Sequence, residues 1–348
     1  MVPRASVEKT LTLLKQRGLL NSQLKIRSEN DFIQIPLSRE PFAWELEMIR
    51  NDVPDVKLCE SEFPERQEKT TKPADLLSDK LPSHLLASLP HAVDFVGDIA
   101  VVEMPPELEP HKLAIGDAIM KAHKRVRTVL SKSSPVNGVY RLRTFEIIGG
   151  DARTQTVHKE HGCVYHVDLA KAYFSSRLSY EHLRVASLVK ENETVVDMFS
   201  GVGPFAILTA KKHASVRVFA VDLNPNAYEL LRKNVLVNRV MAKVTPILGD
   251  IRQVVNQRLA GVADRVIMNL PEKAIDYVDV ACEVLKPEGG VVHYYEFVDT
   301  PEPLENARNH FAEALKRTNR RLLRITETRI VRGIAPFKFQ VAVDAEIR

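Results

Sequence analysis

The sequence predicts an α/β fold whose C-terminal half holds an open, mainly parallel sheet. The first observation is a buried apolar run, Val195-Val196, that ends in Asp197 and breaks into a glycine-containing turn before a helix over 204–211. The second is that three later runs end in the same way, at Asp222, Asp250 and Asn269. Because the carboxyl ends of parallel strands meet at one edge of such a sheet, we expect these polar residues to surround a ligand site.

The turn after the first strand differs from the dinucleotide-binding fingerprint. Gly201 and Gly203 provide G-x-G, but Phe205 and Ala206 follow where a third glycine would allow close approach of a pyrophosphate. Taken alone, this turn is equally well an ordinary strand-to-helix connection, and any single acid could be a helix N-cap. The series of four strand ends favours a binding site.

That series resembles the class I S-adenosylmethionine-dependent methyltransferases. The resemblance implies that Asp197 and the Phe199 to Gly203 backbone hold the methionine part of the cofactor, Asp222 with Leu223 the ribose, and Asp250 the adenine end. Asn269-Leu270-Pro271 is similar to the Asn-Pro-Pro motif of members that methylate nitrogen, although Leu270 departs from the commonest form. The resemblance therefore implies a nitrogen acceptor.

Length and composition allow two or three domains. The chain has 348 residues, a net charge of +4 and three widely spaced cysteines, which argues against a disulfide framework or a zinc site. No apolar run reaches the length of a membrane span, and no signal core follows the N-terminus. We expect a reduced, cytoplasmic protein with no membrane association and no structural metal, acting as a monomer.

Two smaller units are predicted before the sheet. Residues 1–65 form a small α+β domain with a helix that ends near Gly18 and a strand over 32–37. Residues 66–80 are polar and proline-containing and are interpreted as a linker. Residues 81–176 form a middle α+β domain with a hairpin over 93–103 and a helix over 111–131, and residues 177–348 form the sheet domain.

A basic stretch follows in the middle domain. From 121 to 143 the chain carries seven Lys or Arg and no Asp or Glu. Such a run is often only a solvated helix face, but its continuation into a loop favours a surface that follows a phosphate backbone. The residues predicted to bind RNA are Lys121, Lys124, Arg125, Arg127, Lys132 and Arg143.

Further motifs make the resemblance more specific. Tyr140-Arg141-Leu142-Arg143, the block from Asp168 to Phe174, and Arg177-Leu178-Ser179-Tyr180-Glu181 are similar to the archaeal and eukaryotic tRNA (guanine-37 N1)-methyltransferase family. Ser176 and Gly149 depart from that family's usual proline and alanine. The resemblance spans nearly the whole chain and implies a Rossmann-like methyltransferase domain preceded by two domains that recognise tRNA.

The family resemblance also assigns roles to individual residues. It implies that Glu181 is the general base, that Arg141 stabilises charge on guanine O6, and that Asn269 orients the base. It further places Tyr173, Arg177 and Pro271 at the cofactor. Removal of the N1 proton as the methyl group arrives requires a base, and the charge that develops on O6 requires a planar donor. The alternatives without a catalytic role are that Glu181 pairs with Arg177 on a helix and that Arg141 binds phosphate.

Three alternatives remain open. One is a bifunctional relative that also methylates a tricyclic wyosine precursor. Another is a catalytically dead tRNA-binding scaffold, and a third is a methyltransferase for proteins or small molecules. Four histidines, at 158, 161, 166 and 182, match no zinc template.

Overall fold

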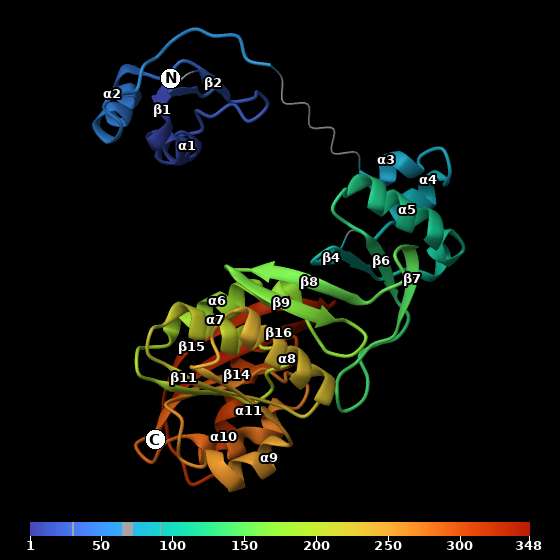
Figure 1. Ribbon diagram of the computed structural model, residues 1–348, viewed down its shortest axis with the longest axis vertical. Helices are drawn as coiled ribbons and strands as arrows, with labels where there is room; N and C mark the ends of the chain where they lie inside the picture. Colours follow the sequence, from blue (N-terminus) through green and yellow to red (C-terminus); the bar gives the residue numbers. More distant parts are fainter. Residues whose placement is uncertain (30, 65–71, 91) are drawn as a thin grey trace. The chain divides into compact units, whose positions relative to one another are not determined.

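The computed structural model describes residues 1–29, 31–64, 72–90 and 92–348 and divides the chain into two compact units (Figure 1). The first unit is Met1–Thr70 and the second is Thr71–Arg348. Each unit has its own buried cluster of apolar side chains.

The first unit is a small three-stranded sheet with two helices. Its elements are β1 (Val2–Pro3), α1 (Val7–Gln16), β2 (Arg27–Glu29), β3 (Phe32–Gln34) and α2 (Ala43–Asp52), with β3 between its antiparallel partners β1 and β2. Leu14, Leu19 and Ile49 are buried at its centre. The helix and the strand expected from the sequence are both present, the strand shorter than predicted.

Most of the segment expected to be a linker folds with the second unit. The part of that prediction at 66–71 lies outside the described residues. Beyond it, α3 (Pro73–Leu77) and α4 (Ser83–Ala87) form, and Leu77 and Leu81 are buried against α5 (Lys112–Ala122). Leu77, inside the predicted linker, and Leu81, just beyond it, anchor this stretch, because burial of each removes apolar surface from water.

After α3 and α4, the second unit continues with a four-stranded sheet in the order β4-β5-β6-β7. Its strands are β4 (Val93–Val96), β5 (Ile99–Val102), β6 (Thr128–Lys132) and β7 (Phe145–Gly150). The hairpin around Gly97 is confirmed. A separate hairpin, β8 (Gln155–Glu160) with β9 (Cys163–Asp168), comes directly after β7 along the chain.

The helix predicted over 111–131 is wrong beyond Ala122. The helix α5 ends there, and Thr128 to Lys132 instead form β6, a buried strand parallel to β5. A short run that is buried throughout has no polar face, so its periodicity does not distinguish a buried strand from a buried helix.

The C-terminal part is a seven-stranded sheet in the order β12-β11-β10-β13-β14-β16-β15. Strands β10 to β14 pair in parallel, β16 pairs antiparallel with β14, and β15 pairs antiparallel with β16 at the edge of the sheet. The strands are β10 (Thr194–Asp197), β11 (Arg217–Asp222), β12 (Val244–Leu248), β13 (Arg265–Met268), β14 (Gly290–Asp299), β15 (Leu322–Ala335) and β16 (Lys338–Ile347). This arrangement confirms the predicted α/β fold.

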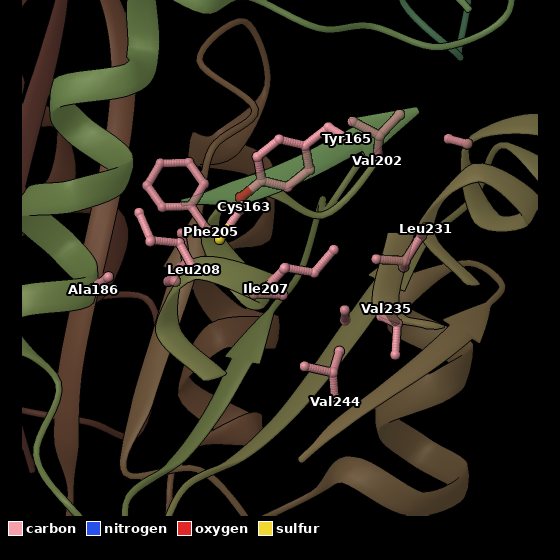
Figure 2. Close-up of a cluster of buried hydrophobic side chains, with 14 of the residues drawn as sticks. Cys163, Tyr165, Ala186, Val202, Phe205, Ile207, Leu208, Leu231, Val235 and Val244 are labelled. Atoms are coloured by element: carbon pink, nitrogen blue, oxygen red, sulfur yellow. The ribbon is translucent and has the colours of Figure 1, made fainter. Parts of the chain in front are cut away.

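Helices cover both faces of this sheet (Figure 1). On one face lie α6 (Ser179–Leu188), α7 (Pro204–Lys212) and α8 (Pro225–Val237), and on the other lie α9 (Ile251–Val254), α10 (Val278–Val284) and α11 (Pro303–Leu315). On the first face, Phe205 and Leu208 from α7 pack with Leu231 from α8 and with Tyr165 from the β8–β9 hairpin (Figure 2). The hairpin is thereby fixed to the sheet domain, close to where the first strand turns into α7.

No helix among the described residues is long and apolar enough to cross a membrane.

Candidate active site

The turn between β10 and α7 is fastened to the end of the neighbouring strand. The Gly201 amide donates to one carboxylate oxygen of Asp222 at 2.7 Å, and the Asn224 amide donates to the other at 2.8 Å. Gly203 caps α7 with a φ of 94°, a conformation that favours glycine. The strand ends are therefore held together by backbone donors, as their order in the sheet requires.

A cavity opens above these strand ends. Eight of the predicted site residues line it: Arg141, Tyr173, Phe199, Gly201, Asp222, Leu223, Asp250 and Asn269. Leu223 is 41% exposed, and Phe199 packs edge-on against Tyr277, which supplies an apolar wall. Each oxygen of Asp222 retains a lone pair beyond its backbone bond, so the carboxylate can still accept from ligand hydroxyls. These features fit a cofactor with a ribose and a flat ring.

Asp197 lies beneath the turn. Its side chain is fully buried, and neither carboxylate oxygen has a hydrogen-bond partner within the described part of the chain. Burial, together with the nearby Asp222 carboxylate, raises the pKa of Asp197 to about 8. Burial also raises the pKa of Asp222, although its bonds from Asn224 and Gly201 oppose this shift. Two acids thus sit close together with no cation to compensate them among the described residues.

Two further predicted cofactor residues lie away from the cavity. The Arg177 guanidinium pairs with Asp94 of β4 and lines a second, adjacent cavity. Pro271 is buried, and its carbonyl accepts from the Phe297 amide of β14 at 3.0 Å. The structure does not bring either residue to the strand-end cavity, because each is held by a neighbour distant in the sequence.

Arg141 occupies a distinctive position in the loop between β6 and β7. Its φ is 54°, which is unusual for a residue with a side chain. Its guanidinium lies 4.7 Å from the centre of the Tyr173 ring, and one terminal nitrogen is 3.3 Å from Glu272. The Nε atom is buried and has no hydrogen-bond partner among the described residues. A buried donor without a partner is costly, so the loop presents Arg141 for an acceptor.

Glu181 is placed differently from our expectation. Its side chain is buried within α6 and does not line the cavity, although the flanking Leu178 and His182 do. One oxygen accepts from Arg184 at 2.6 Å and from the Tyr295 hydroxyl at 2.8 Å, and the other accepts from Arg329 at 2.9 Å. The predicted pairing with Arg177 is absent from these contacts. Glu181 is instead bound by Arg184 of its own helix and by Tyr295 and Arg329 of β14 and β15, while Arg177 pairs with Asp94.

The second cavity adjoins the first. It shares Arg141, Tyr173 and Glu272 with the strand-end cavity. It is also rich in cationic side chains: Lys132, Arg143, Arg177 and Arg332 line it. Asp94 and Glu103 also line it and pair with Arg177 and Lys132, so Arg143 and Arg332 are the cations there that could meet a polyanion such as a nucleotide backbone. Glu272, Tyr277 and Arg332 were not predicted, since only the fold brings them to these cavities.

Four residues of the basic stretch lie near the end of α5, whereas Lys132 and Arg143 line the second cavity. Lys121, Lys124, Arg125 and Arg127 are exposed around the end of α5. Lys121 pairs with Asp117 at 2.7 Å, and Lys132 with Glu103 at 3.2 Å. The stretch is free of acids only along the chain, because folding brings acids to two of its six predicted RNA-binding residues.

No group of three or more His, Cys, Asp or Glu side chains suited to a metal occurs among the described residues. His158 and His182 instead both face Glu160, with nitrogen–oxygen distances of 3.6 and 2.7 Å.

The chain matches three domain families along its length. Residues 156–323 match the TRM5/TYW2 methyltransferase domain, residues 74–154 the TYW2 N-terminal domain, and residues 1–45 the tRNA methyltransferase 5 N-terminal domain. A curated relative, the tRNA (guanine(37)-N(1))-methyltransferase Trm5b of Pyrococcus abyssi, is 35% identical, covering 99% of this chain and 98% of its own. The chain belongs to the TRM5/TYW2 methyltransferase family.

Other relatives are named for different reactions. The tRNA 4-demethylwyosine(37)-methyltransferase Taw21 of Saccharolobus solfataricus is 38% identical over 72% of this chain and 92% of its own. An aminocarboxypropyltransferase of Methanocaldococcus jannaschii is 34% identical over 72% and 96%. Unlike the match to Trm5b, these two matches leave more than a quarter of the chain uncovered.

Solved structures agree with this assignment. The crystal structure of Trm5b from Pyrococcus abyssi has a TM-score of 0.72 and 33% identity, covering 99% of this chain and 98% of that one. The complex of aTrm5 with tRNALeu has a TM-score of 0.70 and 32% identity, covering 100% and 98%. TYW2 of M. jannaschii, solved in complex with AdoMet, has a TM-score of 0.57 and 30% identity, covering 74% and 99%. The protein is an S-adenosylmethionine-dependent methyltransferase, as the sequence predicted.

Proposed function

We propose that this protein transfers a methyl group from S-adenosylmethionine to N1 of guanine at position 37 of tRNA. The observation that carries the proposal is the position of Arg141. Its guanidinium lies where the cofactor cavity meets the cation-lined cavity, with a buried Nε that lacks a partner among the described residues. The full-length similarity to Trm5b supports the same acceptor.

The cofactor residues are proposed from the geometry of the strand ends. Asp222 would accept from the ribose hydroxyls and Asp250 would lie at the adenine end, with Phe199 and Tyr277 as apolar walls. Bound S-adenosylmethionine supplies an electrophilic methyl group. Asp197 and Gly203 would support the turn from beneath, since neither lines the cavity.

The acceptor chemistry explains why an arginine and an amide are needed. Guanine N1 carries a proton, and its removal moves negative charge onto O6. The Arg141 guanidinium and the Asn269 amide are donors that can stabilise this charge in a site that excludes water. The target base must leave its stack to enter such a site. The exposed residues Lys124, Arg125 and Arg127 would bind the phosphates of the surrounding tRNA.

Glu181 remains our proposed general base. Its carboxylate is engaged by three side chains in the conformation described above. The role therefore requires that the carboxylate exchange the Arg329 contact for the N1 proton when the base is bound. Arg329 is the partner that would be released, because its side chain is 23% exposed, against 10% for Arg184.

The test is transfer of labelled methyl from S-adenosylmethionine to an unmodified tRNA transcript with guanine at position 37, followed by identification of the product nucleoside. Transcripts with adenine at position 37 serve as the matched control. We expect 1-methylguanosine from the first transcript alone. Tight tRNA binding without transfer would instead indicate a scaffold.

The Glu181→Gln variant is assayed beside the wild type. We expect it to bind both substrates and to lose about 10²–10⁴-fold in rate, the usual contribution of a general base. A wild-type rate in this variant would remove Glu181 from the mechanism and leave it as an anchor of α6.

A second candidate acceptor is the wyosine precursor. The 38% identity to Taw21 over 72% of this chain favours testing it. The same assay with tRNA that carries 4-demethylwyosine at position 37 shows whether this chain methylates both bases.

A further inference from the structure

A buried glutamine stands behind Asn269. Gln340 of β16 is fully buried, and its Nε2 donates to Asn269 Oδ1 at 3.3 Å. Its own Oε1 accepts from Arg332 Nε of β15 at 2.8 Å. Arg332 of β15, Gln340 of β16 and Asn269, the residue after β13, thus form one chain of hydrogen bonds that ends at the cavity.

The irregular pairing of β15 makes this chain possible. Ile330 pairs with Val341, but Arg332 pairs with Gln340, so β15 has one residue more than β16 at this point. Such a bulge turns the following side chain toward a new partner. Arg332 consequently stands opposite Gln340.

Hydrogen-bond chemistry then fixes both amides. An arginine side chain can only donate, so Gln340 must direct its oxygen toward Arg332 and its nitrogen toward Asn269. Asn269 must accept with Oδ1, which leaves its Nδ2 as the donor available to a ligand. The orientation of the Asn269 amide is therefore decided at Arg332, two side chains away.

Arg332 has a second connection to the site. Its terminal nitrogens donate to the Tyr173 hydroxyl at 3.1 Å and to Ser175 Oγ at 2.8 Å. The Tyr173 ring in turn supports the Arg141 guanidinium. One guanidinium thus organises both proposed donors to the acceptor base.

We propose that Arg332 and Gln340 are positioning residues that make Asn269 present its N–H group to the oxygen of the acceptor base. This inference rests on the proposed function, since it assigns the donor that would face guanine O6. It explains why a fully buried amide, costly when unsatisfied, lies at this end of the sheet. It also predicts a preference for acceptor bases that have a carbonyl oxygen next to the methylated nitrogen.

The decisive variant is Gln340→Glu, which keeps the size of the side chain and its acceptor for Arg332. A carboxylate cannot donate to Asn269, so the Asn269 amide turns over and directs its oxygen at the base. We expect the single-turnover rate at saturating tRNA and cofactor to fall about 100-fold, as for loss of one donor to a developing oxyanion. The thermal midpoint and the dissociation constants for both substrates should change little. A merely structural role would instead lower the thermal midpoint or weaken binding.

A double-mutant cycle shows whether Gln340 acts through Asn269. In the Asn269→Ala background, Gln340→Glu should cause no further loss of rate, because the group it orients is gone. Multiplicative losses would overturn the proposal. Arg324→Gln is the matched control, since Arg324 lies on β15 as Arg332 does, pairs with Glu346 at 2.6 Å and makes none of these contacts.

Arg332→Met provides an independent test if Gln340→Glu does not fold. It removes the donor that fixes Gln340, and we expect at least a tenfold loss of the same rate. Rates within twofold of wild type in every folded variant would overturn the proposal. Absence of methyl transfer to guanine-37 by the wild type would instead overturn the proposed function, so the two failures are distinguishable.

Discussion

At the scale of single residues, Arg141 is the side chain whose surroundings most clearly call for a ligand. It is held by the Tyr173 ring on one side and Glu272 on the other, yet its buried Nε has no partner among the described residues. The neighbouring Arg143 lines only the second cavity. The two arginines are thus expected to have separable roles.

Arg141→Lys should therefore lower the rate of methyl transfer. A lysine keeps the charge but loses the planar, forked donors, and we expect about a 10²-fold lower single-turnover rate with cofactor affinity nearly unchanged. Arg143→Lys is the matched control and should alter tRNA affinity alone. Equal effects of the two changes on the rate would contradict this assignment.

The raised pKa of Asp197 makes the free energy of unfolding depend on pH. Its pKa of about 8 in the folded protein lies above the value of 3.8 for a free side chain. The folded state consequently binds more protons than the unfolded state between about pH 4 and 8, so the free energy of unfolding decreases as pH rises through that window.

Asp197→Asn should remove this dependence. We expect the cofactor-free variant to be more stable than wild type by about 1–3 kcal/mol at pH 8, and similar to it at pH 5, because the buried charge is gone. Urea unfolding at the two pH values measures both differences. An unchanged difference between pH 5 and pH 8 would count against the raised pKa.

At the scale of elements, the strand–turn–helix from β10 to α7 depends on a glycine whose backbone and surroundings are both restrictive. At Gly203 the φ is 94°, and a Cβ there would lie 2.4 Å from Leu231 of α8. Gly162, in the β8–β9 turn, has a φ of 76°, but no atom of the described residues lies within 4 Å of such a Cβ. The pair separates the cost of backbone strain from the cost of packing.

Gly203→Ala should accordingly destabilise the protein more than Gly162→Ala. Backbone strain alone costs about 1 kcal/mol in each, and overpacking adds about 1–3 kcal/mol at Gly203. Urea unfolding of the two variants gives the difference directly. Equal losses would show that Leu231 moves aside without cost.

At the scale of the whole molecule, the basic surface is where charge should govern affinity for tRNA. Lys124 and Arg127 are exposed, whereas Lys121 and Lys132 each have an acidic partner. The net charge of +4 is too small to attract RNA by itself, so local groups must supply the attraction.

The double variant Lys124→Gln with Arg127→Gln should weaken tRNA binding at low salt. We expect the slope of log affinity against log salt to decrease by about 1–2, because each lost phosphate contact releases one counterion fewer. Arg232→Gln on α8, which removes an exposed pair with Glu229, is the control. A slope unchanged from wild type would exclude this surface from the tRNA site.

The sequence by itself determined which strand ends meet at one cavity. Asp222, Asp250 and Asn269 were predicted to meet because the carboxyl ends of parallel strands share one edge of the sheet. The strands themselves were predicted from local apolar runs, which do not depend on distant residues. The family motifs likewise predicted Arg141 and Tyr173, and both line the cavity.

Only the tertiary structure decided which groups stand behind those residues. Two of the three partners of Glu181 come from β14 and β15, and the contact of Gln340 with Asn269 depends on the pairing of β16 with a bulged strand. Lys132 acquires an acid from Glu103, the residue after β5. Such contacts join residues far apart in the chain, and they depend on strand register and packing, which periodicity and motif spacing do not specify.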